Sequence, residues 1–342
     1  MTTSHTAILG SLLGTAVGDA FGLPYEGMSR ERVRAFGEIR HRFLGQRGMF
    51  SDDTEHTLML AAAMHAHRDD LKAFQRNFAW KLRWWLLGLP AGVGLSTAKA
   101  ILRLWVGFPP SKSGVCSAGN GAAMRSAIVG VFWADDELKR HEFALTACRI
   151  THTDPRAEES ALLVAEAAAL ASNRIPTVEA LNRLRPFVRS EIMKEQLEVL
   201  KQTLSENNSV SEFATRLGCG YGVSGFAPHT VAVALFAWLR HRDDFEAAVR
   251  SVIECGGDTD TVAAITGGIC GAEVGEAGIP SVWIADICDW PRSVAHIREV
   301  AAAMADSSKP MPCVFWPLAL LRNVVFLAIV LLHGFRRLLP PY

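Results

Sequence analysis

The sequence predicts an all-α fold, because apolar residues recur at helical intervals along most of the chain and alternating strand patterns are almost absent. In segment 71–88 the apolar residues return every three or four positions, and the segment ends in a glycine. Segment 154–172 has Asp154 at the N-cap position and Pro155 at the first helical position, followed by an Ala-rich body. Both segments therefore predict helices.

Other segments follow the same plan. Segments 228–242 and 243–257 each begin with polar residues or proline, and the second ends in a glycine pair. The N-terminal segment 1–22 has the length of a signal sequence, but no Lys or Arg comes before Arg30 and Asp19 interrupts the apolar run. We therefore expect segment 1–22 to be a helix of the mature protein.

The composition narrows the class of protein. Lys and Arg together equal Asp and Glu at 35 each, which argues against a nucleic-acid partner. The seven cysteines never come closer than 15 residues to one another, which excludes a CxxC pair and argues against a disulfide framework. A reducing compartment, the cytoplasm, is the expected location. Since no basic stripe accompanies Trp80, Trp84, Trp85 and Trp105, we expect them in the core and its packing surfaces.

Two predicted helix starts each carry a pair of aspartates, although one cap per helix would suffice and contributes only about 0.3–1 kcal/mol through the helix dipole. If the two starts meet, four carboxylates share a small volume and favour a hard cation such as Mg²⁺ or Mn²⁺. The candidate oxygen ligands are two hydroxyls and four carboxylates, Ser51, Asp52, Asp53, Asp258, Asp260 and Thr261. From their spacing, helix capping and metal binding explain these residues equally well.

Glycines and other small residues predict close packing after the second acidic start. In TVAAITGGICGA, four-residue steps separate Ala264, Gly268 and Ala272, and also Gly267 from Gly271. A glycine inside a helix costs about 1 kcal/mol relative to alanine, so these positions need a packing reason. We expect a central helix that another helix approaches closely.

A further glycine pair lies in the segment GNGAAMRSAIVG, ahead of another predicted helix. Gly119, Asn120 and Gly121 could point backbone N–H groups at a phosphate, although such an entry is more often an ordinary turn.

The sequence resembles the ADP-ribosylglycohydrolase family in five ordered motifs, GSLLGTAVGDAFGLPYEG, SDDTEHTLML, GNGAAMRSAIVG, THTDPRAEES and GGDTDTVAAITGGICGA. The resemblance covers about residues 7 to 290. It implies a compact orthogonal bundle of helices around two Mg²⁺ or Mn²⁺ ions, and hydrolysis of the glycosidic bond between ADP-ribose and a modified acceptor.

The resemblance also assigns residues. It makes the six oxygen-bearing residues above the metal ligands, places Glu26 beside the metals, and implies catalytic roles for Glu26, Asp53 and Asp260. It implies that Gly119, Asn120 and Gly121 contact the diphosphate and ribose and that His152 lines the ligand pocket. The Gly-rich segment 220–230 would place Tyr221 or Phe226 against the adenine. Without the family, His152 is better interpreted as a capping or core histidine.

The acceptor is not readable from the sequence, because arginine, serine, acetyl and nucleic-acid adducts share the same ADP-ribose half. The zero net charge disfavours nucleic-acid adducts. Two alternatives stay open. The family includes eye-lens crystallins, so the chain could be a structural or ADP-ribose-binding member, and the same carboxylates could serve a metal-dependent phosphoryl hydrolase.

The C-terminal residues depart from the family pattern, and we divide the chain into a catalytic domain, 1–305, and a hydrophobic extension, 306–342. The longest uninterrupted apolar run of the extension, 324–332, is too short to span a bilayer, which needs about 20 apolar residues. We expect a helix docked on the bundle or a subunit interface. Membrane association through residues 313–342, with Arg336 and Arg337 near anionic lipid, is the remaining alternative.

Overall fold

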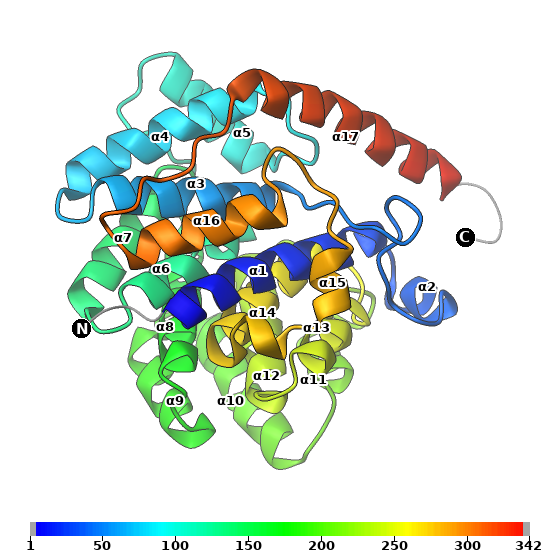
Figure 1. Ribbon diagram of the computed structural model, residues 1–342. Coiled ribbons are helices and arrows are strands. Elements are labelled where there is room, and N and C mark those ends of the chain that lie inside the picture. Colours follow the sequence, from blue (N-terminus) through cyan, green and yellow to red (C-terminus); the bar gives the residue numbers. More distant parts are fainter. Residues whose placement is uncertain (1–4, 338–342) are drawn as a thin grey trace.

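The prediction of an all-α fold is confirmed by the computed structural model, which describes residues 5–337 (Figure 1). The α-helices of these residues are α1 (His5–Gly22), α2 (Arg30–Ala35), α3 (Asp52–Ala66), α4 (Leu71–Leu87), α5 (Leu95–Trp105), α6 (Ala127–Phe132), α7 (Glu137–Arg149), α8 (Pro155–Ser172), α9 (Thr177–Leu184), α10 (Glu191–Ser205), α11 (Val210–Arg216), α12 (Ala227–Arg240), α13 (Phe245–Ile253), α14 (Thr259–Val274), α15 (Ser281–Ala285), α16 (Val294–Ala305) and α17 (Trp316–Arg336). Four short 3-10 helices lie between them, η1 (Leu23–Tyr25), η2 (Asn120–Arg125), η3 (Arg185–Phe187) and η4 (Glu276–Gly278).

Polar side chains fix the starts of many of these helices. The Asp154 side chain accepts a hydrogen bond from the Arg156 amide, and Pro155 stands at the first helical position of α8. The side chain of Asp244 caps α13 in the same way. The four segments singled out by periodicity form α4, α8, α12 and α13, so those predictions are confirmed.

The centre of the bundle is the antiparallel pair of α1 and α14, whose backbones touch. A Cβ atom placed on Gly14 would lie 2.1 Å from the carbonyl oxygen of Gly267, and one on Gly10 would lie 2.0 Å from that of Gly271. The same contact recurs one turn further along, between Gly18 and Ala263. Only glycine fits at these positions of α1, because any side chain would overlap backbone atoms.

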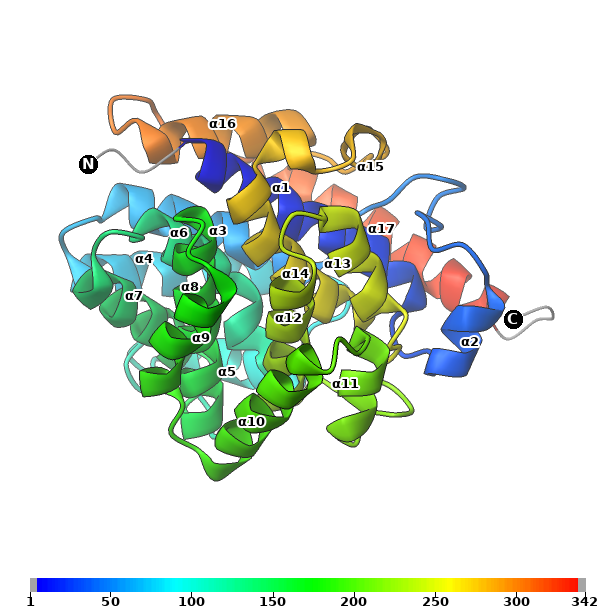
Figure 2. The ribbon, with the colours of Figure 1, turned by 90° about the horizontal axis from the view of Figure 1, so that it is seen from below.

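The predicted close approach to α14 is therefore present, and its partner is α1. Gly267 and Gly271 meet the backbone of α1, whereas a Cβ on Gly268 would meet two side chains, the hydroxyl of Thr15 on α1 and the methyl group of Ala127 on α6. Seen from below, α12 and α13 lie in front of the central pair and α17 lies behind it (Figure 2).

The tryptophans differ from the prediction. Trp85 is buried and donates its indole N–H to Glu55 Oε2 at 2.7 Å. Trp80, Trp84 and Trp105 instead remain 52, 39 and 40 % exposed. Trp80 and Trp84 lie outside the row that α4 buries, which holds Phe74, Phe78, Leu82 and Trp85.

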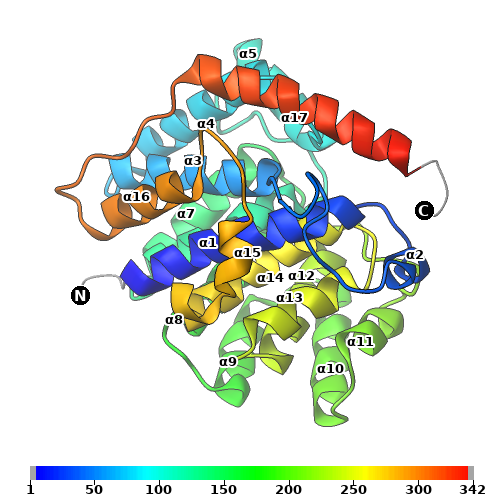
Figure 3. The same cartoon turned by 45° about the vertical axis from the view of Figure 1, so that its right-hand side comes forward.

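The helix α17 packs along one side of the bundle (Figure 3). Its inner face buries Phe326 against Phe43 and buries the polar side chains of Arg322 and Asn323. The Arg322 guanidinium bonds to the carboxylate of Asp289, with Nε to Oδ1 at 3.0 Å, and donates to the Phe50 carbonyl at 2.6 Å. The extension thus contacts the residue directly before Ser51.

Two helices are long and apolar enough to cross a membrane by length and composition alone, namely His5–Tyr25 and Trp316–Arg336. The first is 94 % buried as the core helix α1 with η1, while α17 is only 22 % buried. Arg322 and Asn323, near the middle of α17, are buried against the bundle. Because such polar side chains are costly inside a bilayer, we infer that α17 lies on the protein surface.

We expect Arg322→Met to lower the free energy of unfolding by about 3–5 kcal/mol, because it leaves the buried Asp289 carboxylate without its cation. Chemical denaturation monitored by circular dichroism measures the loss. The double variant Arg322→Met with Asp289→Asn should recover part of it, since asparagine keeps an oxygen acceptor without the charge. A double variant no more stable than Arg322→Met alone would contradict an ion-pair role.

Candidate active site

The starts of α3 and α14 meet, as the resemblance to the family implied. Asp53 Oδ2 accepts hydrogen bonds from Ser51 Oγ at 3.1 Å and from Thr261 Oγ1 at 3.4 Å, so one carboxylate joins the two helix starts. Ser51 is the N-cap of α3, with its Oγ accepting from the Asp53 amide. The condition left open by the sequence, that the two acidic helix starts meet, is therefore fulfilled.

Capping does not explain the acidic start of α14. Asp258 is its N-cap residue, but its side chain makes no capping hydrogen bond to the helix. Asp258 Oδ2 instead accepts from Asn120 Nδ2 at 2.6 Å, and the same Nδ2 lies 3.1 Å from Thr230 Oγ1. The Asp258 carboxylate thus lines the cavity, where Asn120 holds it, and does not cap the helix.

Three carboxylates converge beside this contact. One oxygen from each of Glu26, Asp258 and Asp260 lies within 4.8 Å of the other two, and Asp52 lines the same cavity. Burial, and then the charge of Asp258, raise the pKa of Glu26 to about 7. Burial and the neighbouring acids raise the pKa values of Asp53 and Asp260 well above the ordinary range. These carboxylates need either protons or a cation.

Two buried oxygen atoms support a cation. Asp53 Oδ1 and Asp260 Oδ1 have no hydrogen-bond partner among the described residues, although both side chains are buried. An unpaired buried carboxylate oxygen is costly, and a bound metal ion would compensate it. The surrounding donors are all carboxylate and hydroxyl oxygens, which suits Mg²⁺ or Mn²⁺. The residues of this site therefore fit the cations that the resemblance implied.

A residue that the sequence reasoning did not assign to the site, Asp19 of α1, holds the start of α3. Its Oδ1 accepts from the Ser51 amide at 2.8 Å, and its Oδ2 accepts from the Thr54 amide at 3.0 Å and the Thr54 hydroxyl at 2.6 Å. Burial raises the pKa of Asp19 to about 6. An acid inside an otherwise apolar, Gly-rich helix was the available signal.

The acidic floor opens into a cavity of about 300 Å³. Its wall includes Gly119, Asn120, Gly121 and His152, together with Gly225 from the loop before α12. The two loops are tied together, because the Asn120 amide donates to the Gly225 carbonyl at 3.0 Å and the Ala227 amide donates to the Ala118 carbonyl at 2.8 Å. The loop predicted to contact the substrate thus lies across from the carboxylates.

His152 packs under this loop. A Cβ on Gly121 would lie 3.1 Å from the His152 ring, so the glycine lets the backbone rest on the imidazole. Burial, and then the Arg125 charge, lower the pKa of His152 to about 3, which keeps the ring neutral. Arg125, a second residue that the sequence reasoning did not assign, is buried and donates to the Gly121 carbonyl at 2.9 Å and to Thr151 Oγ1 at 2.7 Å.

Tyr221 lies apart from the other predicted residues. Its side chain is 82 % exposed, and it is not among the described residues that line the cavity. The loop backbone explains this, since the Tyr221 carbonyl accepts from the Arg30 amide and Val223 bonds to Gly256. Phe226 is half-buried, and the guanidinium carbon of Arg156 lies over its ring, 5.4 Å from the ring centroid. The geometry gives no support to adenine stacking on Tyr221.

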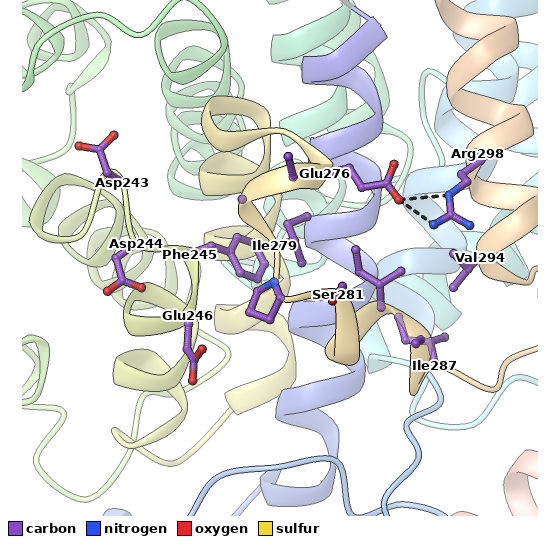
Figure 4. A pocket seen from close by; sticks show the side chains of 15 residues that line it. Asp243, Asp244, Phe245, Glu246, Glu276, Ile279, Ser281, Ile287, Val294 and Arg298 are labelled. Atoms are coloured by element: carbon purple, nitrogen blue, oxygen red, sulfur yellow. Dashed lines mark hydrogen bonds and ion pairs between the residues drawn. The ribbon is translucent and has the colours of Figure 1, made fainter.

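A larger hollow of about 780 Å³ lies elsewhere, between α13, α15 and α16 (Figure 4). Its acids Asp243, Asp244 and Glu246 are exposed, and Glu276 pairs with Arg298 at 2.6 Å. Exposed and paired carboxylates need no cation. This hollow therefore lacks the buried, unpartnered acids that mark the first site.

We expect the acidic centre of the metal-free protein to destabilise the fold increasingly as the pH rises from 5 to 8, so that melting temperatures in EDTA fall relative to those in Mn²⁺. The folded state holds protons on Glu26, with a pKa of about 7, and on Asp19, with a pKa of about 6, whereas the unfolded chain releases them near pH 4. The folded state therefore binds more protons within this window, and the resulting stabilisation is lost as the pH passes the folded pKa values. Saturating Mn²⁺ should weaken the dependence, because the cation replaces the protons. Melting temperatures in EDTA and in Mn²⁺ across this range measure both, and identical slopes would contradict the prediction.

The fold and the site define an all-helical protein with a buried, oxygen-rich acidic centre beneath a polar pocket. Residues 1–311 match the family model for ADP-ribosylglycohydrolase. The chain is 26 % identical over 291 residues to the ADP-ribosyl-[dinitrogen reductase] glycohydrolase of Rhodospirillum rubrum, covering 83 % of this chain and 90 % of the relative. It is 26 % identical over 317 residues to the ADP-ribosylarginine hydrolase Tri1 of Pseudomonas putida, covering 87 and 77 %.

A solved structure, an ADP-ribosylglycohydrolase-related protein complex, superposes with a TM-score of 0.69 at 28 % identity and covers 89 % of this chain and 98 % of its own. The chain therefore belongs to the ADP-ribosylglycohydrolase family, as its five motifs predicted. The family match ends at residue 311, so the helix α17 lies beyond it.

Proposed function

We propose that this protein hydrolyses the glycosidic bond between ADP-ribose and a modified acceptor with the help of two Mg²⁺ or Mn²⁺ ions, and so reverses ADP-ribosylation. The observation that carries the proposal is the pair of buried, unpartnered oxygens, Asp53 Oδ1 and Asp260 Oδ1, where two helix starts meet beneath a polar cavity. The ligands would be Ser51, Asp52, Asp53, Asp258, Asp260 and Thr261.

When bound, such cations orient a ribose through its hydroxyls and lower the pKa of a nearby water. The residues of the chain supply the rest. Asn120 is fixed by Asp258 and Thr230 at the cavity wall, where its backbone and the flanking glycines can hold the ribose and diphosphate. Neutral His152 supports that loop from below without adding charge to the pocket.

Glu26 is the acid best placed to move a proton. Its side chain is accessible from the cavity, whereas Asp53 and Asp260 are buried. In the proposed reaction a water oxygen bonds to the anomeric carbon of the ribose as the bond to the acceptor breaks. Glu26 accepts a proton from that water and then gives it to the departing acceptor, so charge and atoms balance. Asp53 and Asp260 would hold the cations.

The acceptor that we place first is an arginine side chain of a protein, because one relative is named an ADP-ribosylarginine hydrolase and another acts on dinitrogen reductase by name. The experiment incubates the protein with Mg²⁺ or Mn²⁺ and ADP-ribosylated arginine, serine and acetyl compounds, and identifies products by mass. We expect intact ADP-ribose, no free phosphate, and no turnover in EDTA.

Glu26→Gln serves as the matched variant in this assay, since it keeps the shape of the side chain and removes its ability to accept a proton. We expect it to bind the metal and to turn over about 100-fold more slowly. Release of phosphate would assign the protein to phosphoryl hydrolysis. Binding of ADP-ribose with no turnover on any acceptor would assign it to the non-catalytic members.

A further inference from the structure

Three helices meet at a cluster of exposed tryptophans. The ring of Trp84 in α4 lies 6.3 Å from that of Trp105 in α5 and 5.6 Å from that of Trp316 in α17. The Trp316 indole also donates to the Trp84 carbonyl at 2.9 Å. Figures 1 and 3 both show α17 along the upper side of the bundle, next to α4 and α5. We call the exposed side of these three helices the α4–α5–α17 face.

This face is apolar. Its members include Trp80, Trp84, Leu102, Trp105, Leu321 and Leu332. The outer side of α17 contributes most, because that helix has a mean hydropathy of 2.1 and is only 22 % buried. Leu321 and Leu332 are 53 and 69 % exposed. Exposed large apolar side chains that gather on three neighbouring helices are typical of a docking site rather than of a free surface.

The charge of the face has one sign. After Asp70 the chain has no acidic residue until Asp135, and after Asp306 it has none at all. The helices α4, α5 and α17 therefore carry no carboxylate side chain. On α4 the exposed Lys72 and Arg76 precede Trp80 and Trp84 in the same four-residue row, and on α5 Lys99 and Arg103 are exposed. Basic residues therefore do accompany these tryptophans, contrary to the sequence prediction.

An anionic lipid surface complements both properties. Apolar side chains enter the boundary between headgroups and acyl chains, tryptophans favour that boundary, and Lys and Arg attract the anionic headgroups. A second copy of the chain does not fit as well, because pairing this face with itself would oppose basic residues without any acid to compensate them. The occupant that the chemistry favours is therefore a membrane.

The orientation of α17 follows from its anchors. Arg322 and Asn323, near the middle of the helix, are buried against Asp289 and the Gly88 carbonyl. At the C-terminal end, His333 Nε2 lies 3.1 Å from the Pro24 carbonyl. The inner face is thus fixed to the bundle along its length, so α17 lies in the plane of the surface instead of crossing it.

We propose that the α4–α5–α17 face binds the surface of an anionic membrane and holds the protein there with α17 parallel to the bilayer. Leu95, at the start of α5, is 70 % exposed and also lines the cavity of the candidate active site. The cavity therefore opens beside the face, close to the bilayer surface. This inference does not depend on the reaction that the site catalyses.

Vesicle flotation of the full chain tests the proposal, with phosphatidylcholine vesicles and with vesicles that also contain phosphatidylglycerol. We expect binding to the anionic vesicles that weakens as salt is raised, and little binding to the neutral ones. The variant Leu321→Asp with Leu332→Asp should bind about tenfold more weakly, because both changes place carboxylates in the apolar face.

The matched control carries the same number of changes on α7 and α9, Leu138→Asp with Val178→Asp, where the replaced side chains are 78 and 73 % exposed. It should float like the parent, and circular dichroism of both variants checks that they fold. The proposal is overturned if the parent floats with neither vesicle, or if the α17 variant floats as well as the control. It is also overturned if sedimentation shows a dimer that only the α17 variant dissociates while no chain binds lipid.

Discussion

Replacing Asp260 with asparagine should yield a folded protein that releases ADP-ribose about 100-fold more slowly or worse and binds Mn²⁺ at least about tenfold more weakly. The same variant should be more stable than the parent in EDTA. Asp260 is buried among Glu26, Asp53 and Asp258, and its charge raises the free energy of the metal-free protein through repulsion. Removing that charge relieves the repulsion and removes one ligand charge at once.

This combination separates metal binding from helix capping. Asparagine caps a helix about as well as aspartate, so a capping role predicts no change in activity or in metal affinity. A purely structural role for Asp260 does not predict higher stability together with lower activity. The unpartnered Asp260 Oδ1 is the structural reason for expecting both effects.

Three measurements decide the outcome: calorimetric titration with Mn²⁺, product release by mass, and the melting temperature in EDTA. Asp136→Asn is the matched control, because the Asp136 side chain caps α7 by accepting from the Lys139 amide at 3.0 Å, and Asp136 does not line the cavity of the candidate site. It should change none of the three. If Asp260→Asn behaves like this control, Asp260 is only a structural acid in the first turn of α14, and the proposed function loses its main physical support.

The acidic helix starts could be predicted because their signals are local. Ser51 and Asp258 stand directly before helices whose apolar periods are visible in the sequence. Asp19 could not be assigned in the same way, since its role depends on α1 packing beside α3, which brings residues 19 and 51 together across the fold. Arg125 is similar, because its partners Gly121 and Thr151 come from different segments.

Exposure was the harder property to predict. Periodicity placed α4 correctly but did not show which of its tryptophans face water, because both sides of the helix are apolar near its C-terminal end. The same holds for α17, whose composition fits both a docked helix and a lipid-facing one. The structure shows that its inner face is buried against the bundle, but the division of the chain at residue 305 stays a prediction.

The second large effect concerns the central helix pair. We expect Gly14→Ala to lower the free energy of unfolding by about 3 kcal/mol or more, because the new methyl group would lie 2.1 Å from the Gly267 carbonyl oxygen. Backbone atoms on both sides leave no side chain to rotate away, so α1 and α14 must move apart. For a chain of this size the melting temperature should fall by about 4 °C or more.

Gly334→Ala is the matched control, since Gly334 lies in the helix α17 and a Cβ there would meet nothing within 4 Å. It should be neutral or slightly stabilising, by up to about 1 kcal/mol, because alanine favours the helix more than glycine does. Equal melting temperatures for Gly14→Ala and Gly334→Ala would show that the central pair tolerates a wider spacing than the structure indicates.

The two large predictions also check each other through metal binding. A cation that binds only the folded state stabilises it by an amount set by its affinity. Gly14 is not itself a candidate ligand and does not line the cavity of the candidate site, so Mn²⁺ should still raise the melting temperature of Gly14→Ala. Asp260→Asn should gain far less from Mn²⁺ despite its higher stability in EDTA. A normal Mn²⁺ response in Gly14→Ala with a weak response in Asp260→Asn would assign the central glycines to packing and Asp260 to cation binding. A loss of the response in both variants would mean that the spacing of α1 and α14 also shapes the metal site.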